Sequence, residues 1–482
     1  MERLNTGLAE LDLILGGGVP GGSLVVLAGG PGTGKTILAQ QISFAIGRPE
    51  RKGIYYTTLS EPHDKLVRHL EPFDFFDSGA LGDRVEFVHL GDLMPGPEES
   101  PGDLGAIVNE IVRRCLEARP AVIVIDSMKV LHDVVEPQPL RRAIYDLASR
   151  VAHTGVVLLF VGEYTSEEIE RLPEFALADG ILQLAYEPHE PLDRRWLRVV
   201  KMRGSSPLSG KHSFRIGRAG IEVFPRLESI VLTREQPVAD GRISSGMPEL
   251  DELMGGGVPV ADATAVLGPT GSGKTAIALR FVVEGVRADE SCLYISFQET
   301  ADQLVQKAGS FGWDLTSGVD SGLVRIHHVP QGDLNLDLIG AVVQDELASR
   351  PIRRVALDSL GELVVAARET ERFPAYARML SGLVRAAGAS LIVTSETNVM
   401  GPILEPLGGL SFLFHNVVLL RYVELESEMG RALNVLKMRD SAHAKGLVQF
   451  DIDEHGPRIV GKLDGLTGVL GWTALHAERP LP

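Results

Sequence analysis

Two glycine-rich segments of this chain have the spacing that lets a polypeptide hold a triphosphate. The pattern Gly-x-x-x-x-Gly-Lys-Thr occupies residues 29–36 and returns at residues 268–275. An apolar run suited to a buried strand precedes each segment and a run suited to a helix follows it, which is the context that a phosphate-binding loop requires. Backbone N–H groups of such a loop face phosphate oxygens, and its lysine adds a positive charge. The sequence therefore predicts one nucleotide-binding module that is present twice.

We expect these two loops to bind ATP together with Mg²⁺. The hydroxyl groups of Thr36 and Thr275 stand where such loops supply a metal ligand. The residues predicted to contact the nucleotide are Gly30, Pro31, Gly32, Thr33, Gly34, Lys35 and Thr36 in the first loop, and Pro269, Thr270, Gly271, Ser272, Gly273, Lys274 and Thr275 in the second.

A second pair of motifs supplies carboxylates for the metal ion. The apolar runs 121–125 and 354–357 end in Asp126 and Asp358, and a serine follows each aspartate. An aspartate at the end of a strand beside a phosphate-binding loop orients Mg²⁺ directly or through water. We predict that both aspartates do so, and the alternative is an aspartate that only caps a turn.

Two further pairs of strands end in glutamates. The runs 53–60 and 292–298 lead into Glu61 and Glu299, and two later runs end at Glu163 and Glu396. Parallel α/β sheets keep their chemistry at the carboxyl ends of their strands. We predict that Glu61 and Glu299 activate water near the γ-phosphate, although each could instead be a solvated cap of the next helix. The later pair either senses the γ-phosphate or consists of ordinary polar residues at strand ends.

The triplet Lys-Met-Arg also occurs twice, in register with the other repeated motifs. It provides Lys201 with Arg203, and Lys437 with Arg439. Residues two apart on a strand point to the same face, so each pair presents two cations together. Such a pair suits neutralisation of a phosphoryl group that a neighbouring subunit supplies. The alternative is a solvated pair that guards an edge strand against unwanted pairing.

Length and composition limit the remaining possibilities. A chain of 482 residues holds two or three domains, and its net charge of −17 argues against binding along a nucleic-acid backbone. Cys115 and Cys292 stand in unrelated contexts, which favours buried thiols in a reducing compartment. The first residues lack an apolar signal segment, and apolar runs such as 156–161 are too short to span a bilayer. We therefore expect a cytoplasmic protein without a membrane partner.

These motifs together resemble the KaiC family of double-domain RecA-like ATPases, which includes the cyanobacterial clock protein. The resemblance rests on Gly-Gly-Gly-Val-Pro at 16–20 and 255–259, both loops, both strand-end aspartates and glutamates, and both Lys-Met-Arg triplets. It implies an α/β chain of two tandem RecA-like P-loop domains, each a mostly parallel twisted sheet flanked by helices. We place the first domain at 1–227, a linker at 228–241, the second domain at 242–465 and a tail at 466–482.

The resemblance also implies how the protein assembles and works. It implies a homohexamer of two stacked rings, with ATP between subunits in both, and regulatory protein partners of unknown identity. Glu61 and Glu299 would activate the attacking water. The cations that would reach the γ-phosphate of the adjacent subunit are Lys201, Arg203, Lys437 and Arg439.

Three departures from the family pattern bear on function. Clock members have two adjacent glutamates at the base position, whereas Ser60 and Gln298 replace the first of each pair here. The adjacent serine and threonine that clock members phosphorylate fall on Ser411 and Phe412, so one acceptor is lost. The C-terminal tail is shorter and lacks a recognisable activator-binding segment.

Four functions stay open at this point. The first is a hexameric ATPase that hydrolyses ATP in one or both rings and acts as a regulatory switch. The second is a serine autokinase and autophosphatase of clock type that acts on Ser411. The third is a RecA-like nucleic-acid motor or recombinase, against which the acidic composition weighs. The fourth is a protein-binding scaffold in which ATP only holds the ring together.

Overall fold

The computed structural model describes most of the chain as two separate units. The described residues are 2–57, 63–90, 104–188, 193–230, 241–330, 332, 334–367, 371–397, 414–425, 428–439, 442–463, 466–467 and 475–476. The chain divides into Met1–Ile230, which we call the first module, and Val231–Pro482, the second module. Residues 231–240, which contain most of the predicted linker, lie outside the described residues.

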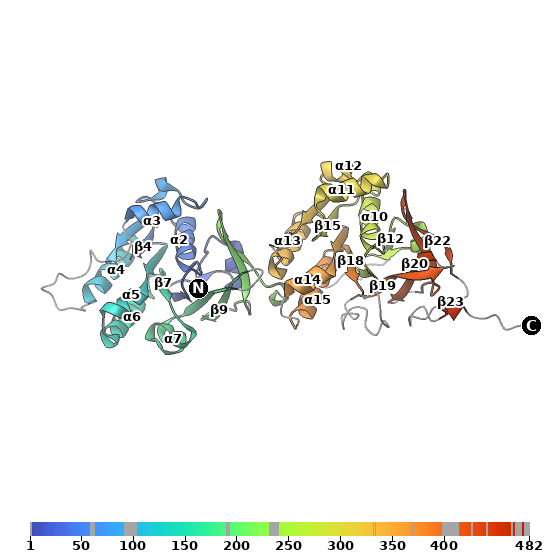
Figure 1. The fold of residues 1–482 in the computed structure, drawn as a ribbon. Helices are drawn as coiled ribbons and strands as arrows, with labels where there is room; N and C mark the ends of the chain where they lie inside the picture. The colour runs from blue at the N-terminus through green and yellow to red at the C-terminus, as the bar shows by residue number, and fades with distance from the viewer. Residues whose placement is uncertain are drawn as a thin grey trace, which may run out of the picture. The chain divides into compact units, whose positions relative to one another are not determined.

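The first module alternates strands and helices along most of its length (Figure 1). Its elements are β1 (Arg3–Leu4), α1 (Ala9–Ile14), β2 (Val19–Pro20), β3 (Leu24–Gly29), α2 (Lys35–Ile46), β4 (Gly53–Thr57), α3 (His63–Leu70), η1 (Ser78–Ala80), β5 (Val85–His89), α4 (Gly105–Ala118), β6 (Val122–Asp126), α5 (Met128–Val134), α6 (Pro137–Val151), β7 (Val157–Glu163), α7 (Ser166–Arg171), α8 (Pro173–Leu177), β8 (Gly180–Glu187), β9 (Arg194–Met202), β10 (His212–Gly217), β11 (Gly220–Phe224) and η3 (Leu227–Ser229).

The second module repeats that order among the described residues, except that it has no described counterparts of α7, α8 and η3 and adds β23 and β24. Its elements are β12 (Arg242–Ile243), α9 (Pro248–Leu253), β13 (Val258–Pro259), β14 (Ala263–Gly268), α10 (Lys274–Arg287), β15 (Cys292–Ser296), α11 (Ala301–Ser310), α12 (Thr316–Asp320), β16 (Val324–His328), α13 (Leu336–Ser349), β17 (Arg354–Asp358), α14 (Leu360–Ala367), α15 (Phe373–Ala386), β18 (Ser390–Glu396), β19 (Asn416–Leu425), β20 (Glu428–Met438), β21 (Val448–Asp453), β22 (Gly456–Lys462), β23 (Leu466–Thr467) and β24 (Leu475–His476).

Each module is built on a nine-stranded sheet with the same topology. The order is β11-β10-β9-β8-β3-β7-β6-β4-β5 in the first module, and β22-β21-β20-β19-β14-β18-β17-β15-β16 in the second. The strands from β8 to β5 run parallel, whereas β9, β10 and β11 are added antiparallel. The second sheet follows the same rule. The predicted α/β class, with a mostly parallel sheet in each half, is confirmed.

The loop-bearing strand β3 lies at the centre of the first core. All six of its residues are buried. Successive side chains of a strand point to opposite faces, so Val25 packs into the cluster that contains Leu38 of α2, and Val26 packs into the cluster that contains Ile111 of α4. Helices therefore cover both faces, which is the usual setting of a parallel sheet.

Two other expectations concern the two cysteines and the membrane-spanning helices. Cys115 and Cys292 are free thiols, and both are fully buried as predicted. Among the described residues, no helix combines the length and the apolar character needed to cross a bilayer.

Candidate nucleotide-binding sites

The two phosphate-binding loops connect the central strand of each sheet to a buried helix. The first loop leaves β3 at Gly29 and enters α2 at Lys35. Gly32 and Gly34 have φ values of +68° and +92°, a region that glycine enters without steric cost. The helix has no side-chain cap, so its first N–H groups are available to an anion. The second loop repeats this geometry at Gly271 and Gly273, with φ values of +75° and +107°.

The lysine of each loop is folded back onto its own loop. Lys35 Nζ donates to the Gly30 carbonyl over 2.7 Å, and Lys274 Nζ donates to the Pro269 carbonyl over 2.9 Å. Burial lowers the pKa of both lysines, whereas nearby carboxylates such as Glu163 act in the opposite direction. A bound triphosphate would offset this desolvation, because it would place negative charge beside the ammonium group.

In the first module, the predicted metal ligands already touch each other. Thr36 Oγ1 donates a hydrogen bond of 2.8 Å to Asp126 Oδ2. Tyr55 of β4 donates to the same oxygen over 2.6 Å. Mg²⁺ in nucleotide sites is held by one or two carboxylates together with phosphate oxygens and water, so a hydroxyl beside a carboxylate fits the ion. Tyr55 is a site residue that motif reasoning missed.

The corresponding aspartate of the second module has a different second partner. Tyr294 of β15 donates to Asp358 Oδ2 over 3.0 Å, as Tyr55 does to Asp126. Thr394 of β18 donates to Asp358 Oδ1. Burial raises the pKa of Tyr294 well above its ordinary value, and the charge of Asp358 raises it further. The tyrosine therefore stays a neutral donor that holds the aspartate in place.

Of the two predicted bases, the structure describes only Glu299. It lies just after β15, and its backbone N–H donates to Ser296 Oγ over 3.1 Å. One carboxylate oxygen, Oε1, forms an ion pair with Lys307 of α11. The other, Oε2, is buried and has no hydrogen-bond partner in the part of the chain that the structure describes. Glu61 and its neighbour Ser60 lie outside the described residues.

The predicted phosphate sensors end β7 and β18, next to the loops. Glu163 and Glu396 are both exposed. Each carboxylate is close enough to raise the pKa of the lysine in its own loop. In the second module the contact is direct, because Thr270 Oγ1 donates to Glu396 Oε1 over 2.9 Å.

Each Lys-Met-Arg triplet ends an antiparallel strand and follows a β-bulge. The register of β9 with β8 shifts between Val199 and Lys201, and that of β20 with β19 shifts before Lys437 in the same way. The central methionines, Met202 and Met438, are buried. The lysines are half-buried and the arginines exposed, and each arginine lies just beyond the end of its strand, so the same-face arrangement stays a prediction. A bulge re-aims nearby side chains, and nothing in the sequence indicated it.

Arg203, Lys437 and Arg439 have partners within their own module. Burial lowers the pKa of Lys201, and the charge of Arg203 lowers it further, which shows that the two cations are close together. Arg203 forms an ion pair of 3.4 Å with Asp179. Lys437 Nζ donates to the Phe414 carbonyl over 3.0 Å, and Arg439 lies 3.1 Å from the ring of His415.

The strand register puts the cationic pairs near the amino ends of the parallel strands and the loops at their carboxyl ends. Lys201 lies opposite Ile181, which itself lies opposite Val26 near the start of β3. The phosphate-binding loop leaves β3 at the other end, after Gly29. In the second module Lys437 lies opposite Val417, near the start of β14. The structure thus brings loop, aspartate and Glu299 to the carboxyl edge, and it does not bring the cations there.

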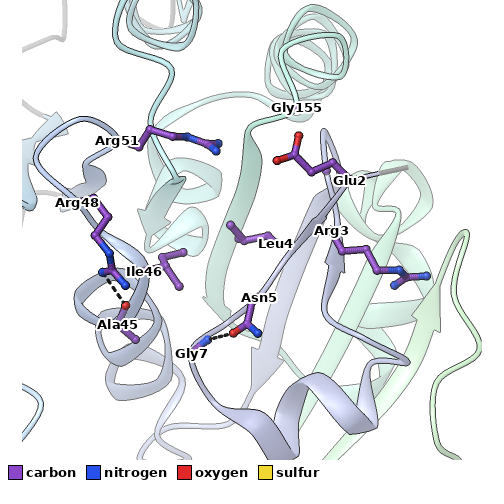
Figure 2. A pocket seen from close by; sticks show the side chains of 11 residues that line it. Glu2, Arg3, Leu4, Asn5, Gly7, Ala45, Ile46, Arg48, Arg51 and Gly155 are labelled. Atoms are coloured by element: carbon purple, nitrogen blue, oxygen red, sulfur yellow. Dashed lines mark hydrogen bonds between the residues drawn. The ribbon is translucent and has the colours of Figure 1, made fainter.

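A cavity of about 330 Å³ in the first module is lined by residues of β1 and of the end of α2, among others (Figure 2). Arg3, Arg48 and Arg51 line it, but all three donate to main-chain carbonyls of the same module. Arg48 donates to the Ala45 carbonyl over 3.0 Å, and Arg3 donates to the Gly18 carbonyl over 2.9 Å. We assign no chemistry to this cavity. The described residues also contain no cluster of three potential metal ligands of the His, Cys, Asp or Glu type.

The fold and these sites define a tandem P-loop nucleotide-binding protein. A family model described as "ATPase: KaiC" matches residues 4–228 and again residues 243–464. The chain therefore belongs to the KaiC family of ATPases, and the RecA-like character predicted for both domains is confirmed.

Curated relatives cover nearly the whole chain. Circadian clock protein KaiC3 of Synechocystis sp. is 29% identical, over 99% of this chain and 96% of the relative. Circadian clock oscillator protein KaiC of Parathermosynechococcus lividus is 30% identical, over 98% of this chain and 87% of the relative. The same-named protein of Picosynechococcus sp. is 29% identical, over 95% and 90%.

Two of the departures noted in the sequence lie outside the described residues. The structure does not describe Ser411 and Phe412, and it does not describe most of the tail. Phosphorylation of Ser411 therefore stays a prediction, as do the domain boundaries at 227, 241 and 465.

Proposed function

We propose that this protein hydrolyses ATP at interfaces between copies of itself, within a homohexamer of two stacked rings, and that turnover drives a regulatory switch. The supporting observation is that each module has its loop and its strand-end aspartate at the carboxyl ends of the parallel strands. The cationic pair of each module lies near the amino ends of those strands: Lys201 with Arg203 in the first module and Lys437 with Arg439 in the second. A module cannot bring these two groups together by itself. A neighbouring copy that faces it head to tail can, and repetition of such a contact closes a ring.

The chemistry proposed for the first site is in-line attack of water on the γ-phosphorus. Loop N–H groups and Lys35 hold the phosphates, while Tyr55 keeps Asp126 in place beside Thr36. Mg²⁺, when bound, neutralises charge on the β- and γ-phosphate oxygens. Glu61 takes the proton of the attacking water as the new P–O bond forms and the bond to the β,γ-bridging oxygen breaks.

The second site uses equivalent groups. Lys274 and the loop hold the phosphates, Thr275 and Asp358 suit the metal, and Glu299 takes the proton. In both sites, Lys and Arg of the neighbouring copy would stabilise the negative charge that develops on the transferring group. Such cations supplied in trans contribute factors of about 10³ or more.

A subunit-mixing experiment tests the interface directly. In a Glu299→Gln background, which silences the second module, we combine a Lys35→Ala chain with a chain that carries Lys201→Ala and Arg203→Ala. Each chain alone is expected to be inactive. In a 1:1 mixture, about a quarter of the heterologous interfaces pair an intact loop with intact cations, so activity should return. A mixture as inactive as its parts would refute a shared site.

The assembly state is measured in parallel. Light scattering with and without Mg-ATP reports the mass of the particle, and phosphate release reports turnover. Single chains at saturating ATP would contradict the proposal. A single burst of phosphate release without continued turnover would favour a scaffold held together by ATP.

Autophosphorylation is tested on the same preparation. The matched relatives bear the names of clock proteins, so phosphopeptide mapping after incubation with Mg-ATP is informative. Phosphate on Ser411 would support an autokinase. An unmodified second module would leave ATP hydrolysis as the activity.

A further inference from the structure

We propose that Lys307 positions Glu299 as the base of the second module by holding one of its carboxylate oxygens. This inference rests on the proposed function, in which Glu299 activates the attacking water. It assigns a role to a residue outside the repeated motifs, and it sets the two modules apart.

The backbone around Glu299 is fixed on both sides. On the strand side, its N–H donates to Ser296 Oγ over 3.1 Å. On the helix side, Thr300 caps α11, and Gln303 completes a capping box with it. With the main chain held in this way, the direction of the carboxylate depends on contacts made by the side chain itself.

Lys307 provides such a contact from the second turn of α11. Side chains of a helix lean toward its N-terminus, so the ammonium group of Lys307 extends back toward Glu299. It pairs with Oε1, and the two side chains are 34% and 28% exposed. A pair that is only partly open to water holds its geometry better than a fully solvated one.

The second oxygen of Glu299 is left for chemistry. Oε2 is buried, and no described residue donates a hydrogen bond to it. A buried carboxylate oxygen without a donor is costly and calls for an explanation.

These observations fit a general arrangement of catalytic bases. A third group fixes one side of the base, and the other side accepts the proton. Here Lys307 is the fixing group, Oε1 is the fixed oxygen, and Oε2 is the oxygen directed at the water. Lys307 is thus a positioning residue, because it acts on the substrate only through Glu299.

The first module has a different residue at the equivalent place. Counting from Glu61 as from Glu299, the eighth residue is His69 instead of a lysine. His69 is exposed near the end of α3. An imidazole has a shorter reach than a lysine and carries a full charge only when protonated. Of the two modules, only the second therefore has a lysine at this position.

The test compares variants of the full chain in a Glu61→Gln background, so that turnover comes from the second module. Lys307→Met should lower kcat by about ten- to hundredfold, because small misplacements of catalytic groups have effects of that size. The KM for ATP, the ring mass and the thermal unfolding temperature should stay the same. Lys307→Arg should restore most of the rate, since it keeps the cation. Gln306→Met, on the exposed face of the same helix, is the matched control.

The outcomes distinguish a failure of the positioning role of Lys307 from a failure of the proposed ATP hydrolysis. An unchanged or increased kcat in Lys307→Met, combined with a strong loss in Glu299→Gln, would overturn the positioning role and leave the ATPase proposal intact. An unchanged rate in Glu299→Gln would instead refute the proposed chemistry of the second module. If Lys307→Met does not fold, Lys307→Gln with and without added propylammonium decides. Rescue of kcat supports the role, and absence of rescue overturns it.

Discussion

The equivalent aspartates Asp126 and Asp358 each accept one hydrogen bond that is the same in both modules and one that differs between them. Tyrosines on β4 and β15 donate to Oδ2 of Asp126 and Asp358. The second donor to Asp126 is Thr36 of the loop itself. The second donor to Asp358 is Thr394, on the neighbouring strand β18. By strand register, the equivalent of Thr394 in the first module is Val161, which has no hydroxyl group.

The loops differ in a complementary way. In the second module, Thr270 donates to Glu396, and the Thr270 carbonyl accepts a hydrogen bond of 3.1 Å from Tyr422. The equivalent of Thr270 in the first module is Pro31, which can donate to no carboxylate. The first module therefore ties its aspartate to its loop, whereas the second ties both loop and aspartate to the sheet. One catalytic layout can thus be kept rigid in two ways.

The largest expected effect tests what the modules have in common. Combined Lys201→Ala and Arg203→Ala should lower first-module kcat by about 10³-fold, because in the proposed mechanism both cations stabilise the transferring group in trans. Lys437→Ala with Arg439→Ala should do the same in the second module. Phosphate release is measured with the opposite module silenced by Glu299→Gln or Glu61→Gln. A loss confined to one module would show that only that module depends on its neighbour.

The next effect concerns a buried cation in one module only. Arg354 is 2% exposed at the start of β17, where it pairs with Glu290 and donates to the Ser244 carbonyl over 2.6 Å. By register, Val122 occupies this place in the first module. Arg354→Ala should cost about 3 kcal/mol of stability, because it leaves these partners unpaired. Hydrogen exchange of the β17 amides in urea measures it, and the exposed Arg353→Ala variant should change little.

The third effect compares the loops. Lys35→Ala and Lys274→Ala should each weaken ATP binding in their own module by about 100-fold, through loss of a charge-assisted contact to phosphate. Equilibrium binding of a fluorescent ATP analogue measures this, with Lys52→Ala as a control outside the loop. Light scattering at limiting ATP then shows on which module the proposed ring depends. Equal affinity in the variant and the unmodified chain would mean that the lysine contributes nothing to binding.

The parts of this architecture that follow from local patterns could be predicted from the sequence. Loop spacing, strand-end aspartates and their repetition predicted two α/β modules and put the loops at the ends of central strands. The Lys-Met-Arg triplets predicted paired cations on one face, because alternation along a strand is a local property. Met202, which lies between the two cations in the sequence, is buried.

Contacts between strands could not be predicted in this way. Tyr55 reaches Asp126 because β4 and β6 are neighbours with Thr57 opposite Asp126, and that register is set by packing of the whole sheet. In the sequence, Thr394 is an ordinary residue of an apolar strand. Its role becomes visible only because β18 pairs with β17 in the sheet. Lys307 is likewise distant in sequence from every motif except the glutamate that it holds.

The smallest effect concerns the contact that differs between the two proposed metal sites. Thr394→Val gives the second module the residue type of the first and removes a donor to Asp358. Outer partners of this kind contribute about tenfold to metal affinity, so second-module turnover should need about tenfold more Mg²⁺. A Mg²⁺ titration of phosphate release in a Glu61→Gln background measures the shift, and Thr394→Ser is the control that keeps the hydroxyl.

The reciprocal substitution makes the comparison sharper. Val161→Thr places a hydroxyl beside Asp126, whose Oδ2 already accepts hydrogen bonds from Thr36 and Tyr55. Because that aspartate is held from the loop, a further donor should change the Mg²⁺ requirement of the first module by less than about twofold. A tenfold change in both modules would mean that Asp126 and Asp358 are equally dependent on the sheet. The loop contact of Thr36 would then contribute little, and the difference between the modules would lie in Thr270 and Tyr422 instead.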